Sequence, residues 1–138
     1  MAHAIVPVER LCRGLVADDD PFYRAMVAEA LWRAGVSPLA VDNGRDAWEV
    51  LTGPEPTGLA VVNWLLPDLD GYRICRLLEG RRDRPLLIVM AGSLVTSTGQ
   101  PDPLLSAADM CLTKPFGPEA LRRCLRRTAL EMIAQGQR

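Results

Sequence analysis

Long apolar runs, aromatic side chains and histidine are all scarce in this 138-residue sequence, and each scarcity excludes something. No apolar stretch approaches the roughly 20 residues that a transmembrane helix requires, so we expect no membrane contact. The amino terminus, MAHAIVPVER, lacks the apolar core of a secretory signal, which favours a cytoplasmic location. The single histidine, His3, lies in this terminal segment and offers no general base for an enzyme.

A strong charge of one sign and paired cysteines are also lacking. The formal net charge is −1, which disfavours direct binding to nucleic acid. The four cysteines, Cys12, Cys75, Cys111 and Cys124, are scattered and form no CxxC pair. Because such pairs are typical of zinc and redox sites, we interpret these cysteines as reduced, small core side chains.

What the sequence does contain is an alternation of short apolar runs with amphipathic segments. The runs predict strands over 11–17, 39–41, 59–62 and 85–90, and a fifth within 108–113. The other segments predict helices over 22–34, 45–51, 70–79 and about 118–133, whereas 91–106 is irregular. This alternation predicts an α/β fold, a doubly wound five-stranded parallel sheet with helices on both faces. We expect a single domain over 1–138, with its core at about 11–133.

Smaller patterns refine these elements. Asp20 followed by Pro21 is typical of a helix amino-terminal cap. Phe22 falls on the apolar face of the first helix and Leu77 on that of the third, so both are expected to face the core. The basic loop 80–84 is interpreted as solvated.

Polar side chains stand where predicted strands end. Asp18 and Asp19 follow the first strand, Asn63 ends the central strand, and Lys114 follows the fifth. The carboxyl ends of parallel strands meet at one edge, where open α/β sheets bind ligands. Acids can hold Mg²⁺ through oxygens, and a lysine opposite them can hold a phosphoryl or carboxylate group. The alternative for Asn63 is a local bond to backbone that closes the strand end.

Four motifs connect this pattern to a known family. LVADDDPF, NWLLPDLDG, PLLIVMA and LTKPFGPEAL resemble, in order and spacing, the receiver domain of two-component response regulators. The resemblance covers nearly the whole chain. It implies a (βα)5 fold with the flavodoxin-like (CheY-like) strand order 2-1-3-4-5. It also implies a phosphorylatable aspartate, an acidic pair that binds Mg²⁺, and a hydroxyl residue and a lysine that contact the phosphoryl group.

Some residues match the family pattern. Asp18 and Asp19 match the acidic pair, with Asp19 as the direct metal ligand and Asp18 acting through water. Lys114 matches the lysine, whose bond to the next proline is typically cis in the family. Leu65 would offer its backbone carbonyl to the metal, and Gly71 matches the glycine after the phosphorylation site.

Three positions depart from the pattern. Asn63 stands in place of the phosphoacceptor aspartate, Met90 in place of the Thr or Ser, and Cys111 in place of the aromatic switch residue. An amide is neutral and cannot act as the carboxylate nucleophile of phosphoryl transfer. We therefore expect no catalytic residue and no phosphorylation at Asn63. Met90 cannot donate a hydrogen bond to a phosphoryl oxygen, and Cys111 has no large ring to move.

The implied Mg²⁺ site has one negative charge fewer than the family pattern. Its expected ligands are Asp19, Asp18, the carbonyl of Asn63, and Leu65. We expect weakened Mg²⁺ binding and no other cofactor. Ser93, Thr96 or Thr98 could supply a replacement hydroxyl, but none of them replaces the missing nucleophile.

These observations favour a degenerate receiver, or pseudo-receiver, that binds a protein partner without being phosphorylated. The implied partners are a histidine kinase, a phosphotransfer protein or another signalling protein, with a homodimer as a further option. The expected surface is the last helix and the fifth strand, which is the usual output face of the family. Arg122, Arg123, Arg126 and Arg127 on that helix are either a solvated face or a partner patch.

Two alternatives stay open. In the first, the chain is a phosphorylatable receiver that was inactivated by an Asp-to-Asn change at position 63. This alternative predicts that Asn63→Asp restores Mg²⁺-dependent phosphorylation. A flavodoxin-like ligand binder or small enzyme is the other alternative. A flavin phosphate needs a Ser/Thr/Gly-rich loop after the first strand, and the acids at 18–20 would repel it.

Overall fold

The computed structural model of the chain describes residues 13–55, 57–92, 99–100 and 107–136. The strands among these residues are β1 (Arg13–Ala17), β2 (Ser37–Val41), β3 (Leu59–Asn63), β4 (Leu86–Ala91) and β5 (Met110–Thr113). The helices are α1 (Pro21–Arg33), α2 (Gly44–Leu51), α3 (Gly71–Leu78) and α4 (Pro118–Gly136). Most of the irregular stretch 91–106 lies outside the described residues.

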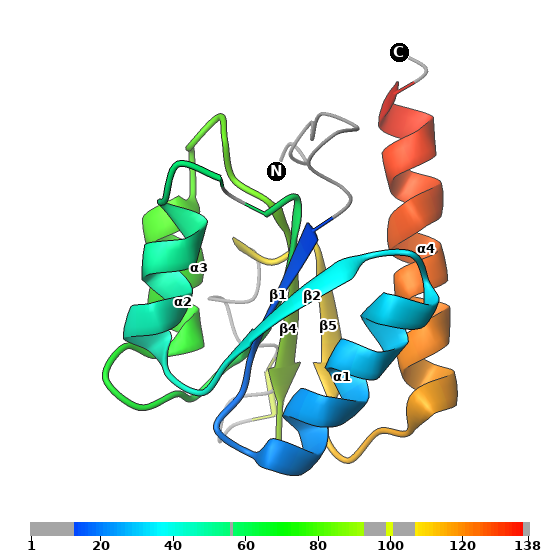
Figure 1. The fold of residues 1–138 in the computed structure, drawn as a ribbon, viewed down its shortest axis with the longest axis horizontal. Helices are drawn as coiled ribbons and strands as arrows, with labels where there is room; N and C mark the ends of the chain where they lie inside the picture. The colour runs from blue at the N-terminus through cyan, green and yellow to red at the C-terminus, as the bar shows by residue number, and fades with distance from the viewer. Residues whose placement is uncertain (1–12, 56, 93–98, 101–106, 137–138) are drawn as a thin grey trace.

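The five strands form one parallel sheet in the order β2-β1-β3-β4-β5, which confirms the predicted fold class and strand order. Helices α2 and α3 lie on one side of the sheet, and α1 and α4 lie on the other (Figure 1). With β3 in the middle, all strand carboxyl ends lie along one edge. The polar residues that follow the strands are therefore brought to that edge.

The central strands are apolar because helices cover both of their faces. Every residue of β4 is buried, as is every residue of β3 except Asn63 at its end. Side chains alternate between two core clusters, so that Val62 faces α2 and α3, whereas Val61 faces α1 and α4. The short apolar runs in the sequence thus correspond to strands buried on both faces.

Three side chains lie elsewhere than predicted. Phe22 is 66% exposed and Leu77 is 48% exposed, so the prediction that both face the core was wrong. Phe22 lies in the first turn of α1 and contacts the edge of the Tyr23 ring, whereas Ile74, Cys75 and Leu78 already fill the inner face of α3. Arg84, expected in a solvated loop, is only 6% exposed and pairs with Asp109.

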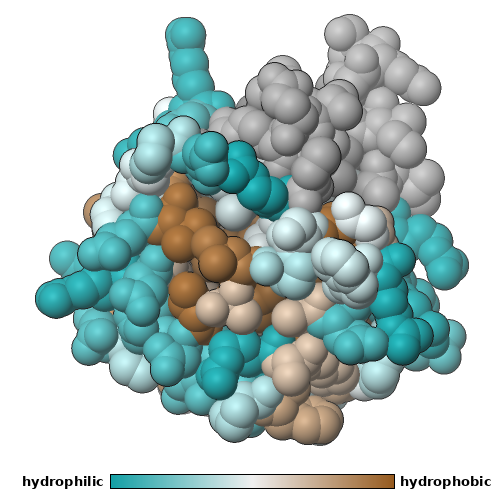
Figure 2. All heavy atoms as spheres, viewed as in Figure 1, coloured by the Kyte–Doolittle hydropathy of each residue, from teal (hydrophilic) through white to brown (hydrophobic). Residues whose placement is uncertain are grey.

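The surface carries an apolar patch beside β2 and α2 (Figure 2). A groove of about 540 Å³ lies there, lined by Leu39, Val50 and Thr57 among others. It opens near the amino ends of β1 and β2, away from the edge where the polar residues gather. None of the described helices is long and apolar enough to cross a membrane.

Candidate functional site

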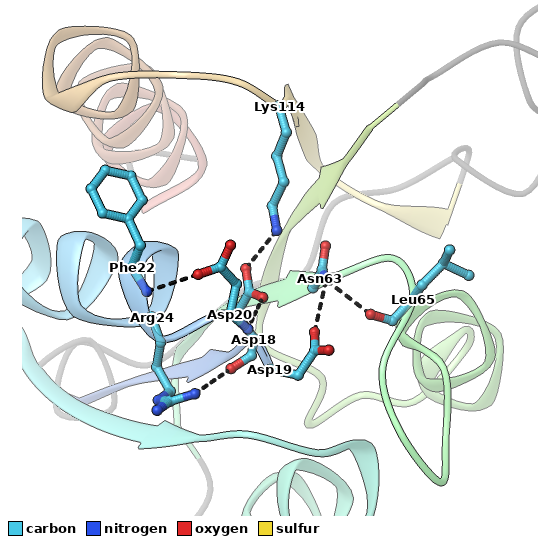
Figure 3. A network of polar contacts seen from close by, with 8 residues as sticks. All are labelled: Asp18, Asp19, Asp20, Phe22, Arg24, Asn63, Leu65 and Lys114. Atoms are coloured by element: carbon cyan, nitrogen blue, oxygen red, sulfur yellow. Dashed lines mark hydrogen bonds and ion pairs between the residues drawn. The ribbon is translucent and has the colours of Figure 1, made fainter.

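The carboxyl edge of the sheet brings together side chains that lie far apart in the sequence. Asp18 and Asp19 follow β1, Asn63 ends β3, and Lys114 follows β5 (Figure 3). Lys114 Nζ lies 2.8 Å from Asp18 Oδ2, although the two residues are 96 positions apart. The four residues form one polar network.

Asp18 is the buried centre of this network. Its side chain is fully buried, and both carboxylate oxygens have partners: Oδ1 accepts from the Asp20 backbone N–H at 2.9 Å, and Oδ2 accepts from Lys114. Arg24 donates to the Asp18 backbone carbonyl at 3.0 Å. A buried carboxylate is tolerated only when it is paired and hydrogen-bonded, and here every oxygen of the residue is satisfied.

The first helix begins directly at this network. The Asp20 side chain accepts from the Phe22 backbone N–H at 2.8 Å, and Pro21 occupies the first helical turn. The predicted cap is thereby confirmed. Asp20 is thus engaged by the helix, which leaves Asp18 and Asp19 to the site.

Asn63 turns its amide nitrogen, not its carbonyl oxygen, toward its neighbours. Nδ2 donates to the Leu65 backbone carbonyl at 2.9 Å and lies 3.5 Å from Asp19 Oδ1 (Figure 3). The first bond has ordinary length and the second is long. Both partners are residues that the sequence analysis expects to contact a metal ion.

Lys114 contacts an aromatic ring that was not predicted from the sequence. Its Nζ lies 4.3 Å from the centre of the Tyr23 ring, and the centres of the Tyr23 and Phe116 rings are 5.1 Å apart. A cation over a ring face is attracted by the ring quadrupole. The Lys114–Pro115 peptide bond is cis, as the family resemblance implies. Tyr23 comes three positions after Asp20 and Phe116 comes two positions after Lys114, and this proximity was the available sequence signal.

The remaining predicted positions add no polar group. Met90 pairs in register with Asn63, but its side chain is fully buried in the core cluster facing α1 and α4. Cys111 is partly buried on β5, and burial raises the pKa of its thiol. Ser93, Thr96 and Thr98 lie outside the described residues.

The loop between β3 and α3 is shaped by close backbone contact. A side chain at Gly71 would place its Cβ 2.0 Å from the backbone oxygen of Asn63, so only glycine fits there. Asp70 Oδ1 accepts from the Leu66 N–H at 3.0 Å, and the Trp64 N–H donates to the Met90 carbonyl at 2.7 Å. The loop that follows Asn63 is thus held on both sides by protein groups.

Comparison with known proteins identifies the family. The model of the response regulator receiver domain matches residues 15–126. The chain belongs to this family. The matched range runs from β1 into α4 and includes every position of the polar network. The chain is therefore a receiver domain of two-component signalling.

Named relatives agree with this assignment. The receiver is 33% identical over 122 residues to the phosphate regulon transcriptional regulatory protein PhoB of Pseudomonas aeruginosa, covering 83% of this chain and 52% of that protein. It is 34% identical over 128 residues to the response regulator MprA of Mycobacterium tuberculosis, covering 89% of this chain and 54% of MprA. The chain therefore spans about half the length of these relatives.

Solved structures share the fold. The response regulator DrrB of Thermotoga maritima has a TM-score of 0.70 and 28% identity, covering 88% of this chain and 54% of DrrB. The chemotaxis response regulator CheY4 of Vibrio cholerae has a TM-score of 0.71 at 20% identity, covering 85% of this chain and 98% of that one. The second likeness shows the fold alone.

Proposed function

We propose that this receiver acts as a protein-interaction module whose output does not require phosphorylation. The observation that carries the proposal is Asn63 at the end of β3, where the family has its phosphoacceptor. Acyl phosphate formation needs an anionic carboxylate that attacks in line, and an amide offers neither the charge nor a free lone pair on nitrogen. Such a receiver is not an enzyme, and we expect it to work in the cytoplasm.

The surroundings of Asn63 support the same conclusion. Lys114, which would contact a phosphoryl group, is paired with Asp18 at 2.8 Å. Met90 is buried and has no hydroxyl, and Cys111 has no ring to move between buried and exposed positions. Acceptor, hydroxyl and switch residue are thus lost together. A single Asp-to-Asn change would have left the other two positions intact, which favours a naturally degenerate receiver over an inactivated one.

Phosphorylation is tested with a small-molecule phosphodonor. Wild type, Asn63→Asp and the double variant Asn63→Asp/Met90→Thr are incubated with acetyl phosphate and Mg²⁺, and intact mass is measured. We expect no phosphoryl mass on wild type, little on Asn63→Asp, and more on the double variant because it regains a hydroxyl. Phosphorylation of wild type in this pocket would overturn the proposal. Efficient phosphorylation of Asn63→Asp alone would favour the inactivated receiver.

A partner surface is available on the α4 and β5 side. Arg122, Arg123, Arg126 and Arg127 of α4 are all exposed. A groove of about 500 Å³ runs along the junction of α4 and β5, and Arg123 and Arg127 line it together with the partly buried Met110 and Cys111. Apolar side chains flanked by arginines are a composition typical of protein interfaces. We therefore assign the protein partner, or a second copy of the receiver, to this surface rather than treating the arginines as solvated.

This surface is tested by charge reversal. The double variant Arg123→Glu/Arg127→Glu is compared with Arg82→Glu, a change of one exposed arginine in the loop before β4. Sedimentation velocity measures self-association, and titration with a histidine kinase domain measures partner binding. We expect the double variant to raise the Kd of either complex about tenfold or more, whereas Arg82→Glu should leave the Kd unchanged. Equal binding by both variants would remove the surface from the proposal.

A further inference from the structure

We infer that the side-chain amide of Asn63 takes the place of the metal ion, so that the pocket is complete without Mg²⁺. This inference deepens the proposed function, because it concerns the same pocket, but it makes a separate claim about cation binding. The claim rests on which atoms the amide contacts and on how the neighbouring carboxylates are used.

The chemistry of the neighbours decides the orientation of the amide. The Leu65 backbone carbonyl can only accept a hydrogen bond, and a carboxylate such as that of Asp19 is likewise an acceptor. The atom of Asn63 that lies 2.9 Å from Leu65 O and 3.5 Å from Asp19 Oδ1 must therefore be the NH₂ group. Its two N–H groups, with their partial positive charges, point toward two oxygens that a cation would otherwise bind.

The residues present do not fit Mg²⁺. The ion demands near-octahedral oxygen ligands, and carboxylates are its main protein ligands. Both oxygens of Asp18 are already engaged, one by the Asp20 N–H and one by Lys114 Nζ. A cation that bound Asp18 would have to compete with these two donors, which leaves the exposed Asp19 as the more accessible carboxylate of the pair. A cation would also have to displace the Asn63 amide from Leu65 and approach the ammonium group of Lys114.

The positive charges of the pocket are likewise supplied by the protein. Lys114 neutralises Asp18, and its ammonium group is held by the Tyr23 ring at 4.3 Å. Arg24 adds a donor to the Asp18 carbonyl at 3.0 Å. Two acidic side chains thus face one ammonium group and one amide donor group. The β3–α3 loop is tied to this arrangement through Leu65, so its shape does not depend on a bound ion.

The test is a Mg²⁺ titration of wild type, Asn63→Asp and Asn63→Ala. Asn63→Asp removes the donor and adds a negative charge, whereas Asn63→Ala removes the donor without adding charge. Calorimetry reports binding, and so does tryptophan fluorescence, to which Trp64 next to Asn63 contributes together with Trp32 and Trp48. Thermal unfolding is recorded for each protein with Mg²⁺ and with EDTA.

We expect wild type to unfold at the same temperature in millimolar Mg²⁺ and in EDTA. Asn63→Asp should bind Mg²⁺ about tenfold or more tightly than wild type, and its unfolding temperature should rise with the ion. Asn63→Ala should bind Mg²⁺ more tightly than wild type and less tightly than Asn63→Asp, because it removes the amide that the ion has to displace but adds no negative charge. Should a variant fail to fold, the side-chain amide signals of wild type in NMR still test the claim, since those of Asn63 should not shift on adding Mg²⁺.

Two results would overturn the inference. One is Mg²⁺ binding by wild type as tight as that of Asn63→Asp, and the other is a large Mg²⁺-induced shift of the Asn63 amide signals. Either result leaves the absence of phosphorylation at Asn63 untouched. Conversely, phosphorylation of wild type would overturn the proposed function. It would leave the inference about Mg²⁺ standing, because that inference concerns the unphosphorylated protein.

Discussion

Thr57 is buried, and its hydroxyl finds no hydrogen-bond partner among the described residues. The residue is 2% exposed, and its Oγ1 is the buried side-chain atom for which the described residues offer no partner. Burying an unsatisfied hydroxyl costs free energy that an apolar group of the same shape does not. We expect Thr57→Val to raise the free energy of unfolding by about 1 kcal/mol, as measured by urea denaturation.

Thr128 provides the matched control for this prediction. It is similarly buried at 3% exposure, but its hydroxyl donates to the Cys124 carbonyl at 2.8 Å. Thr128→Val removes that bond and should lower the free energy of unfolding by about 1 kcal/mol. If both changes shift stability in the same direction, the unsatisfied hydroxyl is not the cause.

At the same scale, the polar network shows how one amide changes the chemistry of a pocket. An aspartate at position 63 would repel the Asp19 carboxylate and the Leu65 carbonyl unless a cation separated them. Asparagine attracts both through its nitrogen, which lies 2.9 Å from Leu65 O. Compared with an aspartate, asparagine at this position therefore replaces repulsion by a hydrogen bond.

At the scale of elements, the junction between β3 and α3 depends on Gly71. A Cβ there would lie 2.0 Å from the Asn63 backbone oxygen, and backbone cannot move aside as a side chain can. We expect Gly71→Ala to lower the free energy of unfolding by about 2 kcal/mol or more. Urea denaturation gives the loss, and the chemical shifts of Asn63 and Leu65 report whether the loop moves.

Gly92 is the control for the glycine prediction. It follows β4 and is exposed, and none of the residues that the structure describes has a heavy atom within 4 Å of the position that a Cβ would take. Gly92→Ala should change the free energy of unfolding by no more than about 0.5 kcal/mol. An equal loss in both variants would mean that close contact at Gly71 is not decisive.

At the scale of the whole molecule, the two core clusters share the strands that separate them. Cys75 belongs to the cluster under α2 and α3, and Cys124 belongs to the one under α1 and α4. Burial raises the pKa of Cys75 to about 12 and that of Cys124 to about 11, so both thiols are protonated and unreactive in the folded chain. Each thiol therefore reports the opening of its own side of the sheet.

We expect both cysteines to become reactive at the same urea concentration, because we predict that the chain folds as one cooperative domain. Pulse labelling with iodoacetamide followed by peptide mass mapping measures each site, and far-UV circular dichroism supplies the common transition. Exposure of Cys124 well before Cys75 would contradict the prediction that one domain covers the chain.

The sequence by itself determined the order of elements and the edge at which the polar residues meet. Strand runs and helix faces are short-range patterns, and right-handed crossovers convert their alternation into one parallel sheet. Once the sheet is parallel, Asp18, Asn63 and Lys114 must lie at the carboxyl ends of their strands, along one edge of the sheet. These features needed no knowledge of atomic contacts.

Only the tertiary structure decided how those residues are used. Lys114 bonds to Asp18 across 96 positions of the sequence, and Arg84 pairs with Asp109 in the interior, 25 positions away. The Asn63 amide shows its nitrogen to Leu65 because the loop carries that carbonyl to within 2.9 Å. Hydrogen bonds depend on distances of tenths of an ångström between segments that only packing brings together, whereas sequence patterns report local periodicity.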